Sequence, residues 1–182
     1  NRGLKHVSLR RFNSIDESLC TAMKHGLEMN TALESLELYI FLVTDDNSKL
    51  WSRALSFLRT NTSLKSLLIN VETGTESSVA AFRSGIVAVL EENVSLESLT
   101  IRRNRSFSID AERYVALVTA LQHNTTLKSI TFQRKGCLRF TDGGKQMAVL
   151  LQKNFALERL PDIKQGGDVD TILRLNEAGR RY

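Results

Sequence analysis

A short phrase, Asn-x-x-Leu followed by alternating apolar and polar residues, recurs along this chain of 182 residues. It opens at six asparagines, with steps of 29, 31, 32, 31 and 30 residues between them: Asn1, Asn30, Asn61, Asn93, Asn124 and Asn154. Near-equal intervals of this length are not expected by chance, and a period of about 20 to 50 residues indicates stacked structural repeats. The phrase therefore predicts six successive units over residues 1–163.

Each unit changes its period part-way. After the anchor leucine the residues alternate apolar and polar, as in Leu36-Glu37-Leu38, which is typical of a strand. A helical pattern then runs up to the next asparagine, and one such face is Leu50, Ala54, Phe57 and Leu58. We therefore predict an α/β fold with a parallel sheet on one face and helices on the other. Because strands pack about 4.8 Å apart and helices about 10 Å apart, the stack is expected to curve, with the sheet concave and the helices convex.

The repeated asparagine is expected at the turn between a helix and the next strand. Backbone amides and carbonyls at a helix end lack helical partners, and a side-chain amide can bond both kinds of group. Asn61, Asn93 and Asn124 also match the glycosylation sequence Asn-x-Ser/Thr. Since their side chains should be turned inward, we interpret them as structural.

The sixth unit departs from the pattern. Pro161 interrupts its strand, Gly166-Gly167 follow, and a short apolar helical face comes after them. An exposed terminal repeat would leave apolar surface in water, so we predict a capping segment over residues 164–182. No comparable cap precedes Asn1, which suggests further chain upstream.

The units resemble a known family. The stretches Asn61-Thr-Ser-Leu-Lys-Ser-Leu-Leu-Ile and Asn124-Thr-Thr-Leu-Lys-Ser-Ile-Thr-Phe resemble leucine-rich repeats of the ribonuclease-inhibitor type, and similar phrasing occurs in tropomodulin-like and nucleotide-receptor-type arrays. The ending from Ile172 to Tyr182 resembles the close of uncharacterised leucine-rich-repeat proteins of algae and diatoms. The resemblance implies a leucine-rich-repeat solenoid that recognises proteins through its concave sheet, with no catalytic residues to carry over.

The residues that could support chemistry do not converge. His6, His25 and His123 fall by repeat position in a strand, a helix and a helix end, so they predict neither a metal site nor a catalytic site. Cys20 and Cys137 are too few and too far apart for a disulfide framework. We therefore expect no enzyme activity, no bound metal and no cofactor.

The strand positions that face away from the helices are candidates for binding. Counted from each anchor leucine, one shared position holds Arg10, Tyr39, Asn70, Arg102 and Gln133. Equivalent positions of stacked units are neighbours, and exposed aromatic, aliphatic and arginine side chains contribute most at interfaces. We predict a partner-binding site on the concave face formed by Tyr39, Leu68, Asn70, Arg102 and Gln133. The alternative is a plain hydrated sheet face.

Basic residues follow the strands of the later units. They predict a basic edge formed by Arg103, Arg105, Arg134, Lys135 and Arg139. The alternative is a solvated rim, because charge clusters are commonly that. An acidic protein would fit this edge. Nucleic acid is not expected, since the net charge is only +5 and no row of aromatic side chains accompanies it.

Together these features predict a non-catalytic module that binds a protein partner through its concave sheet and basic edge. The alternative function is a structural subunit fixed in a large multiprotein assembly. No apolar run approaches the roughly 18 residues of a membrane-spanning helix, so membrane insertion is not expected. The missing secretory signal and the two cysteines favour an intracellular, cytoplasmic location, or an organelle if an upstream targeting segment is missing.

Overall fold

The computed structural model describes residues 3–10, 16–42, 45–73, 76–103, 111–133, 154 and 156–158. Its strands are β1 (His6–Leu9), β2 (Ser35–Leu42), β3 (Ser66–Thr73), β4 (Ser98–Arg103) and β5 (Ser129–Gln133). Its helices are α1 (Glu17–Glu28), α2 (Asp45–Ala54), the 3-10 helix η1 (Leu55–Arg59), α3 (Glu76–Glu92) and α4 (Ala111–His123). The predicted capping segment, residues 164–182, lies outside the described residues.

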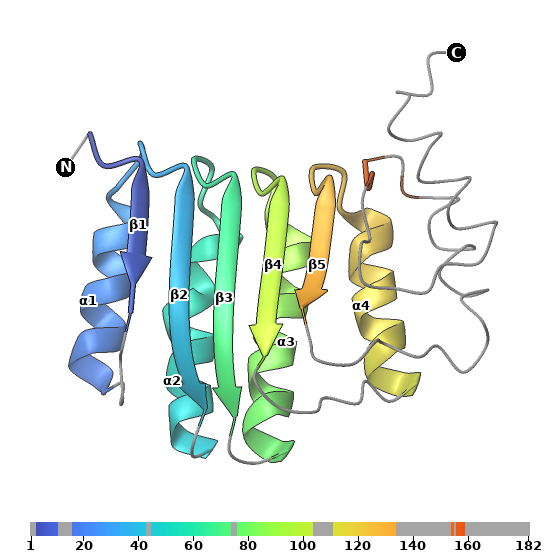
Figure 1. Ribbon diagram of the computed structural model, residues 1–182, viewed down its shortest axis with the longest axis horizontal. Helices are drawn as coiled ribbons and strands as arrows, with labels where there is room; N and C mark the ends of the chain where they lie inside the picture. Colours follow the sequence, from blue (N-terminus) through green and yellow to red (C-terminus); the bar gives the residue numbers. More distant parts are fainter. Residues whose placement is uncertain are drawn as a thin grey trace.

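The described strands form one parallel sheet in the order β1-β2-β3-β4-β5, so strands that are successive in the chain are also neighbours in the sheet. The described helices lie together on one side of this sheet (Figure 1). Helix and strand alternate along the chain because each parallel pairing needs a crossover, and here a helix makes it. The predicted repeat-type α/β fold with a parallel sheet is confirmed.

The apolar positions of the repeat meet in the core between sheet and helices. One row of the sheet register joins Leu36, Leu67, Leu99 and Ile130, each at most 1% exposed. The anchor leucines from the second unit onward are also buried, at 0–2% exposure: Leu33, Leu64, Leu96, Leu127 and Leu157. Burial of each such side chain stabilises the fold by about 1.5–3 kcal/mol, so contacts between neighbouring units hold the stack together.

Leu4 differs from the other anchor leucines, with 44% of its surface exposed. It precedes β1, and β1 pairs with β2 alone among the described strands. Leu4 therefore packs against a neighbouring unit on one side only, which explains its exposure.

The second helical segment packs differently from its sequence pattern. Ala54, Phe57 and Leu58 are buried as predicted, but Trp51, 1% exposed, takes the core position expected for Leu50, which is partly buried. Trp51, Ala54, Leu55 and Leu58 are all buried and follow the spacing of one helical face, so the buried face is turned towards Trp51 relative to the predicted one. The α-helix gives way to a 3-10 helix after Ala54, and Leu55, Phe57 and Leu58 of that segment are buried.

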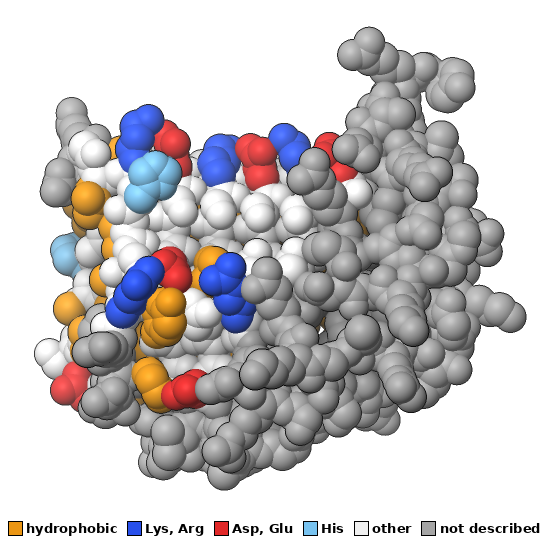
Figure 2. Space-filling model, in the orientation of Figure 1, with side chains coloured by type: hydrophobic (Ala, Val, Ile, Leu, Met, Phe, Trp, Pro, Cys, Tyr) orange, Lys and Arg blue, Asp and Glu red, His pale blue; other side chains and the backbone are white. Residues whose placement is uncertain are grey.

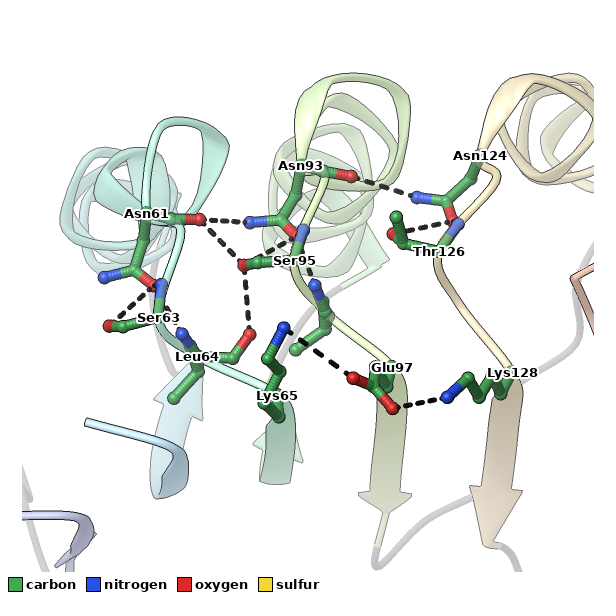
Figure 3. Close-up of polar contacts among 11 residues, drawn as sticks. Asn61, Ser63, Leu64, Lys65, Asn93, Ser95, Glu97, Asn124, Thr126 and Lys128 are labelled. Atoms are coloured by element: carbon green, nitrogen blue, oxygen red, sulfur yellow. Dashed lines mark hydrogen bonds and ion pairs between the residues drawn. The ribbon is translucent and has the colours of Figure 1, made fainter. Parts of the chain in front are cut away.

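The repeated asparagines join neighbouring units (Figure 3). Asn93 accepts from the backbone N–H groups of Ser95 (2.9 Å) and Leu96 (2.7 Å) in its own turn. Its side-chain amide donates to the carbonyls of Leu58 and Asn61 in the preceding unit. Asn124 and Asn154 repeat this arrangement, and all three are at most 4% exposed. The structural interpretation of the asparagines is thus supported.

Among the helices of the described segments, none combines the length and the apolar character needed to cross a membrane.

Candidate functional site

One face of the sheet carries no described helix, and we call it the open face. The strand register arranges its side chains in rows that run across the sheet. One row joins Tyr39, Asn70, Arg102 and Gln133 through direct pairing of β2, β3, β4 and β5. Leu68 lies in the adjacent row, between Glu37 and Thr100. The structure therefore brings together the backbone positions of all five predicted concave-face residues.

A shallow hollow of about 320 Å³ lies on the open face towards the carboxyl ends of β2, β3 and β4, and we call it the Tyr39 pocket. It is lined by Tyr39, Ile40, Phe41, Asn70, Val71, Glu72 and Arg102. Figure 2 shows apolar, basic and acidic side chains side by side on this part of the face, below a band of small polar ones. Such a mixture of aromatic, arginine and carboxylate groups is suited to contact another protein.

Glu37 organises the side chains beside this pocket. Its carboxylate accepts hydrogen bonds from Ser8 Oγ (2.9 Å), Arg10 Nη2 (3.3 Å) and Asn70 Nδ2 (3.4 Å). The Arg10 guanidinium also lies over the Tyr39 ring, 5.5 Å from its centre, at a distance where cation and ring attract. Glu37 and Arg10 thus restrain Tyr39 and Asn70 in the pocket wall.

The charge of Glu37 follows from the same contacts. Partial burial raises the pKa of Glu37, but hydrogen bonds from Ser8, Tyr39 and Arg10 outweigh that effect and lower the pKa below its ordinary value. The carboxylate is therefore ionised at neutral pH, and it balances Arg10.

Phe41 and Glu72 line the pocket although repeat counting did not select them. The predicted row ends at Tyr39 and Asn70, but β2 and β3 continue beyond it and are eight residues long, whereas β4 has six. The extra length adds one more outward position to each, and Phe41 pairs with Glu72 there. The sequence signal for this extra outward position is the continuation of the strand through Tyr39-Ile40-Phe41. Because all three residues are apolar, the alternation of apolar and polar residues does not reveal which of them face outward.

The predicted basic edge lies almost entirely outside the described residues and stays a prediction. Arg103 ends β4 and shares its register with Val71, which pairs in turn with Ile40, and both of these are buried. The side chain of Arg103 lies outside the described residues. Arg105, Arg134, Lys135 and Arg139 lie outside the described residues, and so does the side chain of Gln133.

No group of three or more His, Cys, Asp or Glu side chains that could hold a metal ion occurs in the described part of the chain.

No protein-family model matches the sequence, and no curated protein matches it. A solved structure does match. The fold is similar to that of a leiomodin-1 domain. That structure, "Leiomodin-1 Actin-Binding Site 2 (ABS2)", superposes with a TM-score of 0.62 at 21% sequence identity, covering 92% of this chain and 92% of that chain. The superposition covers nearly the whole of both chains and shows a shared fold, and at this low identity it shows the fold alone.

A second surface feature borders the sheet at the amino ends of its strands. The residue after each anchor leucine alternates in charge across the six units: Lys5, Glu34, Lys65, Glu97, Lys128 and Glu158. Each backbone N–H from Glu34 onward donates to the carbonyl of the preceding member, so these residues are successive neighbours. We call them the charge ladder.

The charge ladder forms ion pairs between units. Lys5 lies 2.7 Å from Glu34, and Glu97 lies 3.6 Å from Lys65 and 2.8 Å from Lys128 (Figure 3). The hydrogen bond from Lys128 lowers the pKa of Glu97, and partial burial opposes it less strongly. Adjacent members of the charge ladder therefore always have opposite charges. If a unit stacked on the next unit but one in place of its own neighbour, residues of like charge would meet.

We expect Glu97→Lys to lower the melting temperature, because it places three lysines in succession along the charge ladder. The decrease should be only about 2 °C, since exposed ion pairs contribute little to stability. Thermal unfolding at neutral pH in low salt measures this. The loss should shrink in 1 M NaCl, which screens repulsion.

Since the pKa of Glu97 is lowered, the contribution of its carboxylate to stability is complete at neutral pH and is lost as the pH falls through that lowered pKa. The control is Glu91→Lys, the same charge change at the exposed end of α3. An equal loss in both variants would contradict the role of the ladder.

Proposed function

We propose that the chain is a leucine-rich-repeat solenoid of the ribonuclease-inhibitor type, concave on its open face, which binds a protein partner there and carries out no reaction. The observation that carries the proposal is the Tyr39 pocket, in which one register row brings an aromatic ring, an amide and an arginine together around a hollow. Arg10 and Glu37 restrain the ring before a partner arrives, which reduces the entropy lost on binding.

The structural comparison suggests a first partner to test. The similar leiomodin-1 structure is titled an actin-binding site. Actin is therefore the first protein we would offer to the open face, and other proteins from native extract come second. An acidic partner would suit the residues proposed for the basic edge: Arg103, Arg105, Arg134, Lys135 and Arg139.

Tyr39→Ala and Arg102→Glu are each expected to weaken partner binding at least about tenfold, since anchors of this kind contribute on the order of 1–2 kcal/mol or more. Cosedimentation with filamentous actin, and capture of proteins from native extract on the immobilised chain, measure this. The melting temperature should stay nearly unchanged, because Tyr39 is half-buried and Arg102 is exposed.

Two variants away from the open face serve as controls. Met29→Ala removes an apolar side chain that is 68% exposed after α1, and Lys49→Glu reverses an exposed charge on α2. Both should bind like the wild type. A partner that binds Tyr39→Ala and Arg102→Glu as tightly as the wild type would overturn the open face as the binding surface.

The exposed edge of the first described unit favours a second candidate, a structural subunit held in a large assembly. Leu4 is 44% exposed, and β1 has an unpaired edge within the described residues, so a neighbouring protein could cover both. Size-exclusion chromatography of native extract separates the two functions. Elution of the protein as a free monomer argues against a permanently fixed subunit.

A further inference from the structure

A second hollow, of about 490 Å³, lies on the opposite side of the molecule, between α1 and the α2–η1 segment. We call it the helix-face pocket. It is lined by Cys20, Thr21, Lys24, Ser52, Arg53, Ser56 and Arg59. It shares no residue with the Tyr39 pocket, and small side chains on both helical segments open the space between them. Its volume falls within the range of about 300–1,000 Å³ that is typical of small-molecule sites.

The lining of this pocket combines cations with hydroxyl groups. Lys24, Arg53 and Arg59 supply positive charge, and none of the described residues that line the pocket is acidic. The acidic partners of these cations stand outside the lining. Glu17 pairs with Arg53 and Glu92 with Arg59, while Lys24 lies 3.9 Å from Glu28.

These ion pairs leave donors available. Glu17 occupies Nη1 and Nη2 of Arg53, and Glu92 occupies Nε and Nη2 of Arg59. Arg53 Nε and Arg59 Nη1 therefore have no partner among the described residues. The side chains in these pairs are 39–63% exposed, so the pairs are weak and a bound anion can compete with them.

The hydroxyl groups have distinct roles. Thr21 and Ser56 donate to backbone carbonyls one helical turn away, at 2.8 and 2.7 Å. Ser52 makes no such bond within the described structure, so its hydroxyl can donate to a ligand. Ser52 also packs against α3, where a Cβ added at Gly85 would come within 2.9 Å of Ser52 Oγ. Its hydroxyl therefore lies on the α3 side of the residue and reaches a ligand in the pocket by rotation about the Cα–Cβ bond.

Cys20 is part of the pocket lining but is not a reactive group. Its thiol donates to the Leu50 carbonyl at 3.3 Å, and burial raises the pKa of Cys20. A neutral, buried thiol is a poor nucleophile, so the pocket is suited to binding and not to covalent chemistry.

We propose that the helix-face pocket binds a tetrahedral oxyanion, a phosphate group either free or as the monoester of a small molecule. Lys24, Arg53 and Arg59 would neutralise its charge, and Ser52 would donate to one oxygen. Guanidinium and ammonium groups form their strongest hydrogen bonds with such oxygens, and arginine matches their geometry. The volume exceeds what a lone phosphate fills, which favours a monoester.

Isothermal titration calorimetry of the whole chain with glycerol phosphate, inorganic phosphate and chloride at matched ionic strength tests the proposal. We expect saturable binding of glycerol phosphate at millimolar concentration, on the order of 1 mM, and none of chloride. Tighter binding of glycerol phosphate than of phosphate identifies a monoester site, and equal binding identifies a site for the free anion. No saturable binding of either would overturn the proposal.

Variants with opposite expected effects sharpen the test. Binding of glycerol phosphate should be weakened by each of three variants: Arg53→Gln, Lys24→Gln and Ser52→Ala. For Arg53→Gln and Lys24→Gln, which each remove a positive charge, the dissociation constant should rise by about fivefold or more. Glu17→Gln should tighten binding, because it removes the carboxylate that competes for Arg53. Lys65→Gln, which removes one positive charge from the charge ladder, should have no effect. Equal weakening by Lys65→Gln would indicate unspecific attraction, and unchanged binding by all four pocket variants would reject the site.

Discussion

Replacing Asn93 with alanine is expected to lower the free energy of unfolding by about 3 kcal/mol. The side chain is 4% exposed and bonds groups from two units. Its loss leaves the N–H groups of Ser95 and Leu96 and the carbonyl of Leu58 without a side-chain partner. Each unpaired buried group costs about 1–3 kcal/mol, and the Asn61 carbonyl is spared because the Ser95 hydroxyl also bonds it, at 2.9 Å.

Urea unfolding measures this loss, and Asn61→Ala is the matched control one unit earlier. Asn61 accepts from Ser63 and Leu64 as Asn93 does from its own turn, but its amide nitrogen donates to no carbonyl within the described residues, and its side chain is only partly buried. We expect a loss of about 1 kcal/mol there. Asn93→Asp keeps the acceptor but places a buried carboxylate oxygen against the carbonyls of Leu58 and Asn61, so its loss should be at least as large as that of Asn93→Ala. Equal losses for Asn61→Ala and Asn93→Ala would contradict the role assigned to the link between units.

Trp51→Ala is expected to cost about 3–5 kcal/mol, the range for deleting a large aromatic side chain from a core. Trp51 is 1% exposed and belongs to the buried cluster together with Leu55, Phe57 and Leu58 of η1. Because its backbone is helical and flanked by packed units, the site cannot collapse fully, and a cavity would remain. Thermal and urea unfolding of the variant measure the loss.

Trp51→Phe is the control, since it keeps an aromatic ring and should cost clearly less than alanine. The chain has one tryptophan, so its fluorescence reports this position without interference. We expect emission from an apolar environment in the native state and a red shift on unfolding. Emission typical of a water-exposed indole in the native protein would show that Trp51 is not in the core.

The prediction for Asn93 bears on the binding surface as well as on stability. The asparagine links set how each unit stacks on the one before it, and the stacking aligns Tyr39, Asn70 and Arg102 in one row. A variant that loosens this link should therefore weaken partner binding along with stability, whereas Tyr39→Ala should affect binding alone.

The repeat alone was sufficient to predict the fold and the rows of the open face. Units of nearly equal length must place equivalent residues side by side, and period-two alternation separates the two faces of a strand. For this reason Tyr39, Asn70, Arg102 and Gln133 could be grouped by counting. The alternation of the charge ladder is equally present in the sequence, but its meaning depends on knowing that these residues are successive neighbours.

Only the tertiary structure revealed the contacts that depend on local departures from the repeat. The buried face of α2 and η1 includes Trp51, and the longer β2 and β3 added Phe41 and Glu72 to the pocket wall. The hydrogen bonds of Glu37 and the helix-face pocket depend on where side chains of different units meet. Periodicity determines which residues are neighbours, but the distances between their side chains depend on helix type, strand length and rotamers, which no repeat length specifies.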